Sequence, residues 1–218
     1  MLPTLPRDSV DLIVTDPPYG VNWSGTTRSS TSTLGLIVGD DGSLDVPSVI
    51  GLALRALSNH RHLYVFGRFD FSSLPIGGNA ELIWDKEIPG PSAPAHWQYQ
   101  HEYIFFSVKS RIPSNRARGD GNGAARLRRG TVLRFKRHNA LGAQRHPTEK
   151  PVGLLRELIE SSSRMGETVL DPFVGSGSTL VAALLEGRKG IGIEIEEKYA
   201  EIAAKRLSQQ TLPLEVTA

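Results

Sequence analysis

Residues 168–194 read TVLDPFVGSGSTLVAALLEGRKGIGIE, and no other part of the 218-residue sequence says more about its fold. Its pattern is a short apolar strand, a glycine-rich turn, an apolar helix, and a second strand that ends on an acid. We expect the strands over 168–170 and 190–194 and the helix over 180–186. This order is the plan of an adenosine-cofactor site in a doubly wound α/β sheet.

The glycine-rich turn has the features that such a cofactor needs. Gly175 and Gly177 let the backbone approach a ligand closely, and the helix that follows offers free N–H groups to a ligand carboxylate. Glu194 ends the next strand, where its carboxylate is placed to accept both ribose hydroxyls. Thr179 and Leu180 occupy the room that a dinucleotide fingerprint leaves for pyrophosphate, so the pattern favours a cofactor without phosphates. The simpler alternative is an ordinary tight turn between a strand and a helix.

A second strand end lies near the N-terminus. Residues 10–15, VDLIVT, predict a strand that stops at Asp16-Pro17-Pro18-Tyr19, and open α/β sheets bind ligands at the carboxyl ends of their strands. Asp16 supplies a carboxylate and Pro17 a carbonyl, two acceptors that hold the N–H bonds of a base amino group while its nitrogen attacks. The prolines stiffen this backbone, and Tyr19 offers an aromatic face on which a base can stack. The alternative is a strand-ending turn with a surface tyrosine.

The rest of the chain alternates strands with helices. Further strands are expected over 62–66, 81–84 and 102–108, and further helices over 46–57, 151–162 and 198–207. Such alternation argues for a doubly wound α/β sheet.

Charge is unevenly distributed along the sequence. The formal net charge is +2, yet residues 110–145 carry +9 and the remainder carries −7. Nine arginines and Lys136 stand in this segment against the single acid Asp120. The asymmetry suggests a polyanionic partner, and the alternative is a solvated basic loop with no specific partner. Charge alone supports the two equally.

Composition narrows the class of protein. The hydrophobic fraction is 39% and the charged fraction 22%, which are ordinary values for a globular chain. No apolar run approaches the roughly 20 residues that span a bilayer, and residues 1–8 do not have the pattern of a signal peptide. The chain has no cysteine, which excludes disulfides and zinc sites built on sulfur. We expect a cytoplasmic, single-domain protein without a metal.

Taken in order, these motifs resemble the permuted β class of amino-group DNA methyltransferases. In that class the D-P-P-Y motif comes first, a target-recognition region follows, and the F-x-G-x-G motif of the cofactor site comes last. Other matching stretches are LIWDK at 82–86, HEY at 101–103 and HPTEKP at 146–151. The resemblance covers most of residues 1–207, apart from the loop after Tyr19 and the basic segment.

The resemblance implies a Rossmann-like α/β fold with a mainly parallel, doubly wound sheet, an antiparallel last strand and a short basic insert. It implies a catalytic half over 1–109, a target-recognition insert over 110–145, a cofactor-binding half over 146–207 and a tail over 208–218.

The resemblance also implies the chemistry, which is transfer of a methyl group from S-adenosylmethionine to a DNA base. Aspartate at the first motif position, here Asp16, is usual in members that act on adenine N6. The residues implied to hold the base are Asp16, Pro17, Pro18 and Tyr19. Those implied to bind the cofactor are Thr148, Lys150, Asp171, Phe173, Gly175, Gly177, Ser178, Thr179 and Glu194.

Individual roles follow from the same resemblance. Thr148 and Lys150 are expected to reach the cofactor carboxylate, Asp171 to lie beside the cofactor amino group, and Glu194 to bind the ribose. A second interpretation of this stretch is a helix start capped by Thr148 with Pro151 in the first turn.

Double-stranded DNA is the expected partner, and some members of the class dimerise, so a homodimer is a second partner to test. The residues expected to contact DNA phosphates are Arg116, Arg118, Arg126, Arg128, Arg129, Arg134, Lys136 and Arg137. Phosphate contacts give affinity without choosing sequence, and the recognition segment is short, so we expect a short or relaxed target site.

One departure from the class leaves alternatives open. Typical members carry a strand and a Gly-Asp pair ahead of the D-P-P-Y strand, and the absence of this element from the sequence predicts reduced cofactor affinity. The competing hypotheses are a catalytically impaired DNA-binding protein of the same shape, or an amino methyltransferase that acts on cytosine N4 or on RNA. A prokaryotic or phage origin and a role in restriction-modification fit the class.

Overall fold

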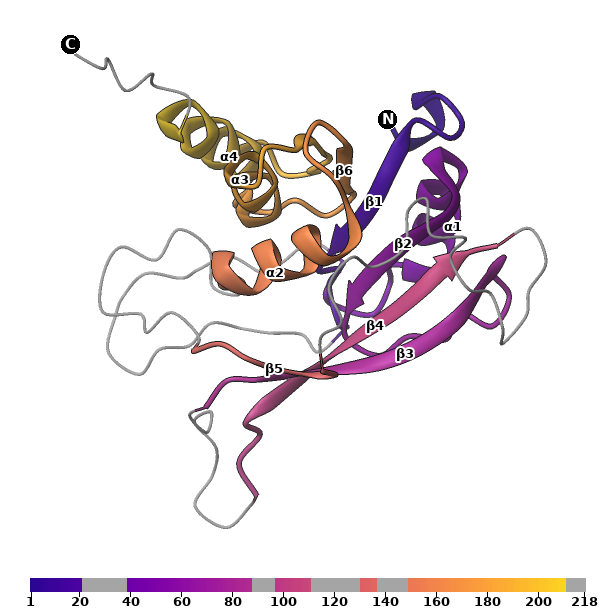
Figure 1. Cartoon of the computed structure of the whole chain (residues 1–218), viewed down its shortest axis with the longest axis vertical. Coiled ribbons are helices and arrows are strands. Elements are labelled where there is room, and N and C mark those ends of the chain that lie inside the picture. The colour runs from indigo at the N-terminus through magenta and orange to yellow at the C-terminus, as the bar shows by residue number, and fades with distance from the viewer. Residues whose placement is uncertain (21–38, 88–96, 111–129, 137–148, 211–218) are drawn as a thin grey trace.

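The computed structural model describes residues 1–20, 39–87, 97–110, 130–136 and 149–210 (Figure 1). Its strands are β1 Val10–Thr15, β2 Leu57–Phe66, β3 Ile76–Asp85, β4 His101–Lys109, β5 Val132–Arg134, β6 Thr168–Asp171 and β7 Lys189–Gly192. Its helices are the 3-10 helix η1 Leu2–Thr4 and the α-helices α1 Val46–Ala56, α2 Val152–Ser162, α3 Ser178–Leu185 and α4 Glu197–Gln210.

The seven strands form one sheet in the order β5-β3-β4-β2-β1-β6-β7. β1 pairs in parallel with β2 and β6, β6 with β7, and β3 with β5, whereas β4 is antiparallel to both of its neighbours. The expected Rossmann-like, mainly parallel sheet is therefore confirmed. The position expected for the antiparallel strand was wrong, because β7 is parallel to β6 and the reversed strand is β4. A hairpin-type return from β3 reverses β4, whereas α3 crosses over between β6 and β7 and keeps them parallel.

Helices cover both faces of the sheet, as a doubly wound fold requires (Figure 1). Leu12 and Val14 of β1 pack with α2 and α3 on one face, where Leu154 and Ala182 are fully buried. On the other face, Ile13 packs with α1. β1 is thus buried on both sides, which explains why residues 10–15 read as a nearly continuous apolar run.

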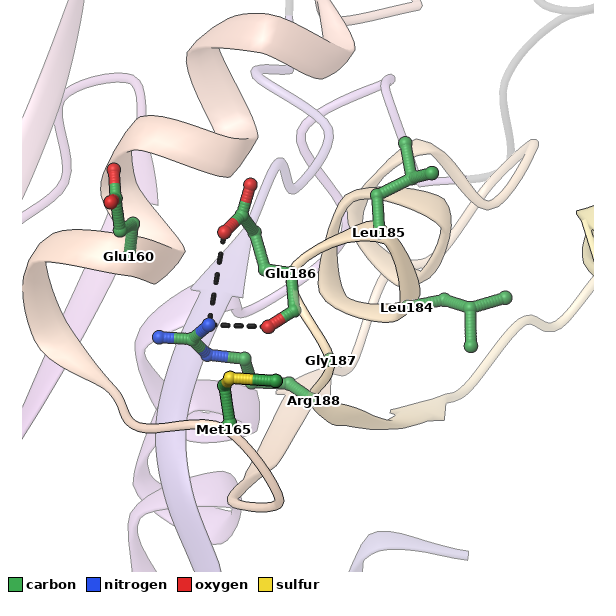
Figure 2. Close-up of a pocket in the computed structure, with 7 residues that line it drawn as sticks. All are labelled: Glu160, Met165, Leu184, Leu185, Glu186, Gly187 and Arg188. Atoms are coloured by element: carbon green, nitrogen blue, oxygen red, sulfur yellow. Dashed lines mark hydrogen bonds and ion pairs between the residues drawn. The ribbon is translucent and has the colours of Figure 1, made fainter.

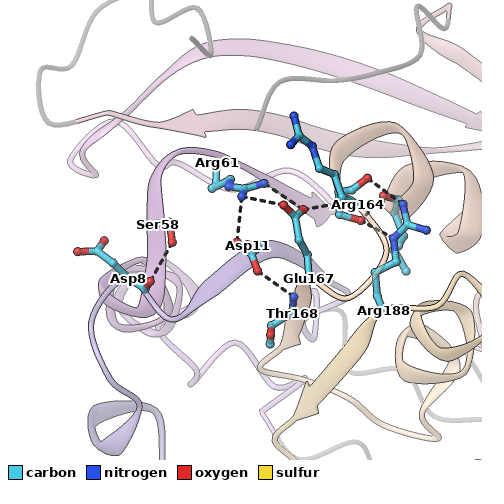
Figure 3. A network of polar contacts seen from close by, with 10 residues as sticks. Asp8, Asp11, Ser58, Arg61, Arg164, Glu167, Thr168 and Arg188 are labelled. Atoms are coloured by element: carbon cyan, nitrogen blue, oxygen red, sulfur yellow. Dashed lines mark hydrogen bonds and ion pairs between the residues drawn. The ribbon is translucent and has the colours of Figure 1, made fainter. Parts of the chain in front are cut away.

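Charged residues fasten the amino ends of the central strands (Figure 3). The Arg61 guanidinium donates to both Glu167 oxygens at 3.1 and 2.9 Å, and its Nη2 lies 3.1 Å from Asp11 Oδ1. Asp11 in turn accepts from the backbone N–H of Thr168 at 2.9 Å. These contacts join β1, β2 and β6, so they also fix how the opposite ends of these strands lie relative to one another.

Most elements lie where the sequence predicts them, with three differences. β2 and β3 begin several residues earlier than expected, and β5 was not expected at all. β5 belongs to the basic segment and is held by parallel pairing, in which Val132 lies opposite Ile83 of β3. β7 ends at Gly192, so Glu194 lies just beyond the strand rather than at its last position. No helix in the described ranges is long and apolar enough to cross a membrane.

Candidate active site at the carboxyl ends of the strands

The sheet brings the two sequence motifs to one edge. Asp16 follows β1, Asp171 ends β6 and Glu194 follows β7, and these three strands are parallel neighbours. Thr15 Oγ1 donates a hydrogen bond of 2.6 Å to Asp171 Oδ1, although the two residues are 156 positions apart. The D-P-P-Y and D-P-F-x-G-x-G stretches therefore start from one pair of hydrogen-bonded strand ends.

Asp16 lies at the centre of a cluster of polar groups. Its Oδ2 is 2.7 Å from Lys150 Nζ, and its Oδ1 accepts a hydrogen bond of 2.6 Å from the Tyr19 hydroxyl. Lys150 Nζ also lies 3.2 Å from Glu102 Oε2, and the Oε1 of Glu102 lies 2.6 Å from Lys86 Nζ. Two carboxylates and two ammonium groups thus compensate one another beside the D-P-P-Y motif.

Burial and charge act in opposite directions on this cluster. Burial raises the pKa of Asp16, and the Lys150 ammonium only partly offsets that effect. Burial also acts to raise the pKa of Glu102, but Lys150 and Lys86 together outweigh it and lower that pKa. For Lys150, burial acts to lower the pKa, but the Asp16 and Glu102 carboxylates prevail and raise it. At neutral pH the ammonium group of Lys150 is therefore retained between two carboxylates.

The D-P-P-Y loop is also fixed at its far end. The backbone N–H groups of Tyr19 and Gly20 donate to Asp40 Oδ1 at 3.1 and 3.0 Å. Gly67 has φ +96° at the end of β2, and a Cβ there would come within 2.9 Å of the Tyr19 ring. A glycine is required at this position both for its backbone conformation and to admit the ring. The Tyr19 side chain keeps 38% of its surface exposed.

The glycine-rich turn is closed by Glu194. Its Oε2 accepts a hydrogen bond of 2.8 Å from the Gly175 N–H, and its Oε1 accepts from the Ile195 and Glu196 N–H groups at 2.9 Å each. A carboxylate has about four lone-pair positions, so these three bonds leave acceptor capacity on the side chain. Glu194 thus retains acceptor positions of the kind that ribose hydroxyls donate to, and its role as the ribose ligand stays a prediction.

Other predicted cofactor residues hold the turn itself. A Cβ on Gly177, where φ is +86°, would come within 2.9 Å of the Ala203 Cβ, so this glycine admits helix α4. Arg206 of α4 reaches back, and its Nη1 donates to Ser176 O at 2.8 Å and to Ser178 Oγ at 3.2 Å. Its Nη2 donates to Glu149 at 2.6 Å. One buried guanidinium therefore links the glycine-rich turn to the HPTEKP stretch.

Asp171 is buried where the ends of β1 and β6 meet. Its side chain is only 2% exposed, and Oδ1 accepts from both Thr15 Oγ1 and the Phe173 N–H, the latter at 3.0 Å. Burial raises its pKa to about 6, although its hydrogen bonds, including one from the buried Thr179, act to lower it. Asp171 thus joins the two strand ends. A position beside the cofactor amino group stays a prediction.

Lys150 lies beside the base-holding motif. Its ammonium contacts Asp16 of that motif and Glu102 of β4, and its predicted contact with the cofactor carboxylate stays a prediction. Sequence reasoning assigned no role to Glu102, Lys86 or Arg206, although HEY and LIWDK were noted as matching stretches. The signal that could have found the first two is their place in the sequence, since Lys86 directly follows β3 and Glu102 lies at the start of β4.

Several predicted residues lie outside the described part of the chain. They are Thr148, Arg116, Arg118, Arg126, Arg128, Arg129 and Arg137. Arg134 and Lys136 are described, and both are exposed on or just after β5. Arg134 Nε lies 3.4 Å from Asp85 Oδ2.

A separate hollow of about 530 Å³ lies at the amino ends of β6 and β7, the edge opposite the candidate site (Figure 2). Met165, Leu184 and Leu185 supply its apolar lining. Arg188 also lines it. The Arg188 guanidinium donates a hydrogen bond of 2.8 Å to Ser163 O and forms an ion pair of 3.7 Å with Glu186. None of the predicted site residues lines this hollow.

The fold and the edge just described define a Rossmann-like methyltransferase, and comparison with known proteins gives the family. The DNA methylase family N6_N4_Mtase matches residues 10–205. The chain belongs to this family of DNA methylases. The expectation of an S-adenosylmethionine-dependent DNA methyltransferase is confirmed.

Curated relatives are similar along most of their length. The DNA adenine methyltransferase YhdJ of Escherichia coli (strain K12) is 29% identical over 94% of this chain and 79% of its own length. The type II methyltransferase M2.MboI of Moraxella bovis is 28% identical over 94% of this chain and 82% of its own.

Solved structures agree on the fold. The M1.HpyAVI–SAM complex matches with a TM-score of 0.64 at 21% identity, covering 91% of this chain and 89% of that one. The cytosine-N4-specific PvuII DNA methyltransferase matches with a TM-score of 0.69 at 15% identity, covering 99% and 84%.

Proposed function

We propose that the protein methylates the N6 amino group of adenine in double-stranded DNA. The observation that carries the proposal is the Asp16 carboxylate, held at 2.7 Å by Lys150 and at 2.6 Å by the Tyr19 hydroxyl at the edge where the glycine-rich turn also lies. The relative YhdJ is a DNA adenine methyltransferase, and this similarity supports adenine as the target base.

Asp16 and the carbonyl of Pro17 would accept the two N–H bonds of the target amino group. An exocyclic amino nitrogen is a weak nucleophile because its lone pair is delocalised, and fixed acceptors favour the tetrahedral nitrogen that attacks. The Pro17-Pro18 backbone keeps these acceptors in place. Bound S-adenosylmethionine supplies a methyl group already activated by a sulfonium. In the transfer, a C–N bond would form as the S–C bond breaks, the sulfur would keep the electron pair, and the amino group would then lose one proton to solvent water.

Tyr19 would serve the base rather than the reaction. Its ring is anchored by Gly67 and its hydroxyl by Asp16, yet 38% of its surface is exposed at the site. A base rotated out of the duplex loses its stacking partners, and an aromatic face replaces part of that energy.

The cofactor half of the site would be formed by the glycine-rich turn and its supports. Glu194 is placed for the ribose, and Gly175, Phe173, Ser178 and Thr179 line or hold the turn. Thr148 stays a prediction for the cofactor carboxylate.

Exposed residues near the end of the β3–β4 hairpin would meet DNA. Arg134 and Lys136 supply positive charge beside this end, and Trp97 and Tyr99 are 97% and 79% exposed just ahead of β4. Phosphates bind cations and unstacked bases bind aromatic faces, so this combination fits a nucleic acid. The remaining arginines of 110–145 and the role of that segment as a recognition insert are part of the same proposal.

Product analysis tests the proposal directly. The protein is incubated in parallel with duplex DNA and with RNA, each with cofactor carrying a labelled methyl group, and the nucleic acid is digested to nucleosides. N6-methyladenine is the expected product, and Asp16→Asn should remove it while the exposed Asp70→Asn, chosen as the matched control, retains it. If the product is N4-methylcytosine instead, the target base is cytosine and the proposal of adenine is wrong. Label in RNA alone, or in no nucleic acid, would overturn the proposal.

A further inference from the structure

Lys150 is placed between two carboxylates that come from different parts of the sheet. Its Nζ lies 2.7 Å from Asp16 Oδ2 after β1 and 3.2 Å from Glu102 Oε2 on β4. Its side chain is 7% exposed, whereas each carboxylate side chain is 24% exposed. The ammonium is therefore the inner member of the cluster, and the carboxylates face outward toward the space at the edge of the sheet.

The surroundings of Lys150 leave it few other partners. The rings of Tyr19 and Phe66 lie 5.4 and 5.2 Å from Nζ, at distances where a cation is attracted to an aromatic face. An ammonium has three N–H donors, and two of them are directed at Asp16 and Glu102. A cofactor carboxylate would have to compete with two carboxylates that already neutralise this charge.

We propose that Lys150 is a positioning residue that orients the Asp16 carboxylate toward the amino group of the target base, and that Glu102 holds Lys150 in that place. The inference rests on the proposed function and assigns Lys150 to the base-holding motif instead of the cofactor. Because Lys150 occupies Oδ2, the other oxygen, Oδ1, is the one that faces Tyr19 and the incoming base.

Glu102 has its own support. Lys86 follows β3 and lies 2.6 Å from Glu102 Oε1, while Lys150 lies at Oε2. Each oxygen of Glu102 thus has one ammonium partner, which prevents the carboxylate from turning. The chain of contacts runs from Lys86 through Glu102 and Lys150 to Asp16, and it crosses from the reversed strand β4 to the parallel strand β1.

The proposal predicts a specific pH effect. The charged and titratable groups that face Asp16 are Lys150, Glu102, Tyr19 and Asp171, with Lys86 behind Glu102. Lys150 is the only cation among those in direct contact in the described residues, and it acts to lower the pKa of Asp16. Removing it should raise that pKa, so the acid limb of kcat should move to higher pH.

The test compares Lys150→Met and Lys150→Arg with Lys198→Met, an exposed lysine paired with Glu196. Lys150→Met should lower kcat by roughly 10- to 100-fold, move its acid limb to higher pH, and leave the cofactor Kd within about twofold by calorimetry. Lys150→Arg should restore part of kcat, and Lys198→Met should change nothing. A large rise in the cofactor Kd with an unmoved pH profile would assign Lys150 to the cofactor and overturn the inference.

Glu102 is tested on its own, since Lys150→Met leaves two carboxylates facing each other and risks unfolding. Glu102→Gln should lower kcat less than Lys150→Met does, and the exposed Glu81→Gln on the neighbouring strand should have no effect. If Glu102→Gln and Glu81→Gln have the same kcat, the proposed role of Glu102 is overturned. Thermal unfolding of every variant separates a lost fold from a lost rate.

A further readout distinguishes this inference from the proposed function. If the wild-type protein does not methylate DNA, the proposed function fails, and the Asp16 carboxyl is then titrated by 13C NMR without substrate. If the pKa of Asp16 is higher in Lys150→Met than in the wild type, the contact between Lys150 and Asp16 is supported. An unchanged Asp16 pKa overturns it.

Discussion

Thr15 and Asp171 share a buried hydrogen bond of 2.6 Å that joins the ends of β1 and β6. Thr15 directly precedes Asp16 of the D-P-P-Y motif, and Asp171 is the first residue of the D-P-F-x-G-x-G stretch. A bond at this place fixes the base-holding and cofactor-holding stretches relative to each other. Two motifs that lie far apart along the chain are thus adjacent in space at this contact.

The buried carboxyl of Asp171 should make stability depend on pH. Its pKa is raised to about 6, so the folded state binds this proton more tightly than the unfolded state does. The stabilisation is complete below the unfolded pKa of 3.8 and is lost as pH rises to about 6. Asp171→Asn should remove this component. In urea unfolding between pH 4 and about 6.5, the free energy of unfolding of the variant should therefore fall less with rising pH than that of the wild type.

Asp45→Asn provides a control of opposite sign for that experiment. The Asp45 carboxylate caps α1 through Ser48, and those hydrogen bonds lower its pKa. Its contribution is present above the unfolded pKa and is lost as pH falls through the lower folded value. The same slope in both variants would contradict the assignment to Asp171.

Gly177 should not accept a side chain. Gly177→Ala places a Cβ 2.9 Å from the Ala203 Cβ at a φ of +86°, and we expect a loss of about 2–3 kcal/mol of stability together with weaker cofactor binding. Gly166→Ala is the matched control, because its φ is +83° and nothing lies within 4 Å of the new Cβ. Denaturant unfolding of both separates backbone strain from the collision, and equal losses would exclude the collision.

Arg206 should contribute to the affinity for the cofactor, although it lies on α4, outside both sequence motifs. Arg206→Met removes the donors to Ser176, Ser178 and Glu149, which leaves the glycine-rich turn without its support from α4. We expect the cofactor Kd to rise by about tenfold or more in calorimetry, since removal of a charged hydrogen-bond partner costs about 1.5–3 kcal/mol. The exposed Lys205→Met on the same helix should leave the Kd unchanged.

The Arg61 contacts at the opposite edge should contribute to stability and not to chemistry. Arg61 and Glu167 side chains are each 16% exposed, and Arg61→Ala leaves both Glu167 and Asp11 without this partner. We expect a loss of about 3 kcal/mol in the free energy of unfolding. Arg156→Ala should cost less than about 1 kcal/mol, because Arg156 is 49% exposed and Glu186 keeps Arg188.

Positive charge on the β5 edge should appear in the salt dependence of DNA binding. Arg134→Ala and Lys136→Ala should each lower the slope of log K against log salt by about 1, with no preference for sequence. Fluorescence anisotropy with duplexes of unrelated sequence measures this slope. An unchanged slope in the double variant would place the DNA elsewhere on the surface.

Local sequence patterns were sufficient to predict the order of the strands and α-helices, apart from β5, and the identity of both motifs. Residues 10–15 and 168–171 are short apolar runs that proline ends, and the Gly175–Gly177 spacing requires a turn, so local chemistry was sufficient. Glu194 was predicted at the cofactor turn for the same reason. These signals depend on neighbours in the chain, which a sequence displays directly.

Which charged side chains contact one another could not be predicted from the sequence. Lys150, Glu102 and Asp16 come from segments far apart in sequence, and parallel and antiparallel pairing around β4 brings them within 2.7 to 3.2 Å. The reversal of β4, the addition of β5 and the clamp of Arg206 likewise depend on contacts across the sheet. Pairing partners and burial set these positions, and neither is encoded in the local pattern of residues.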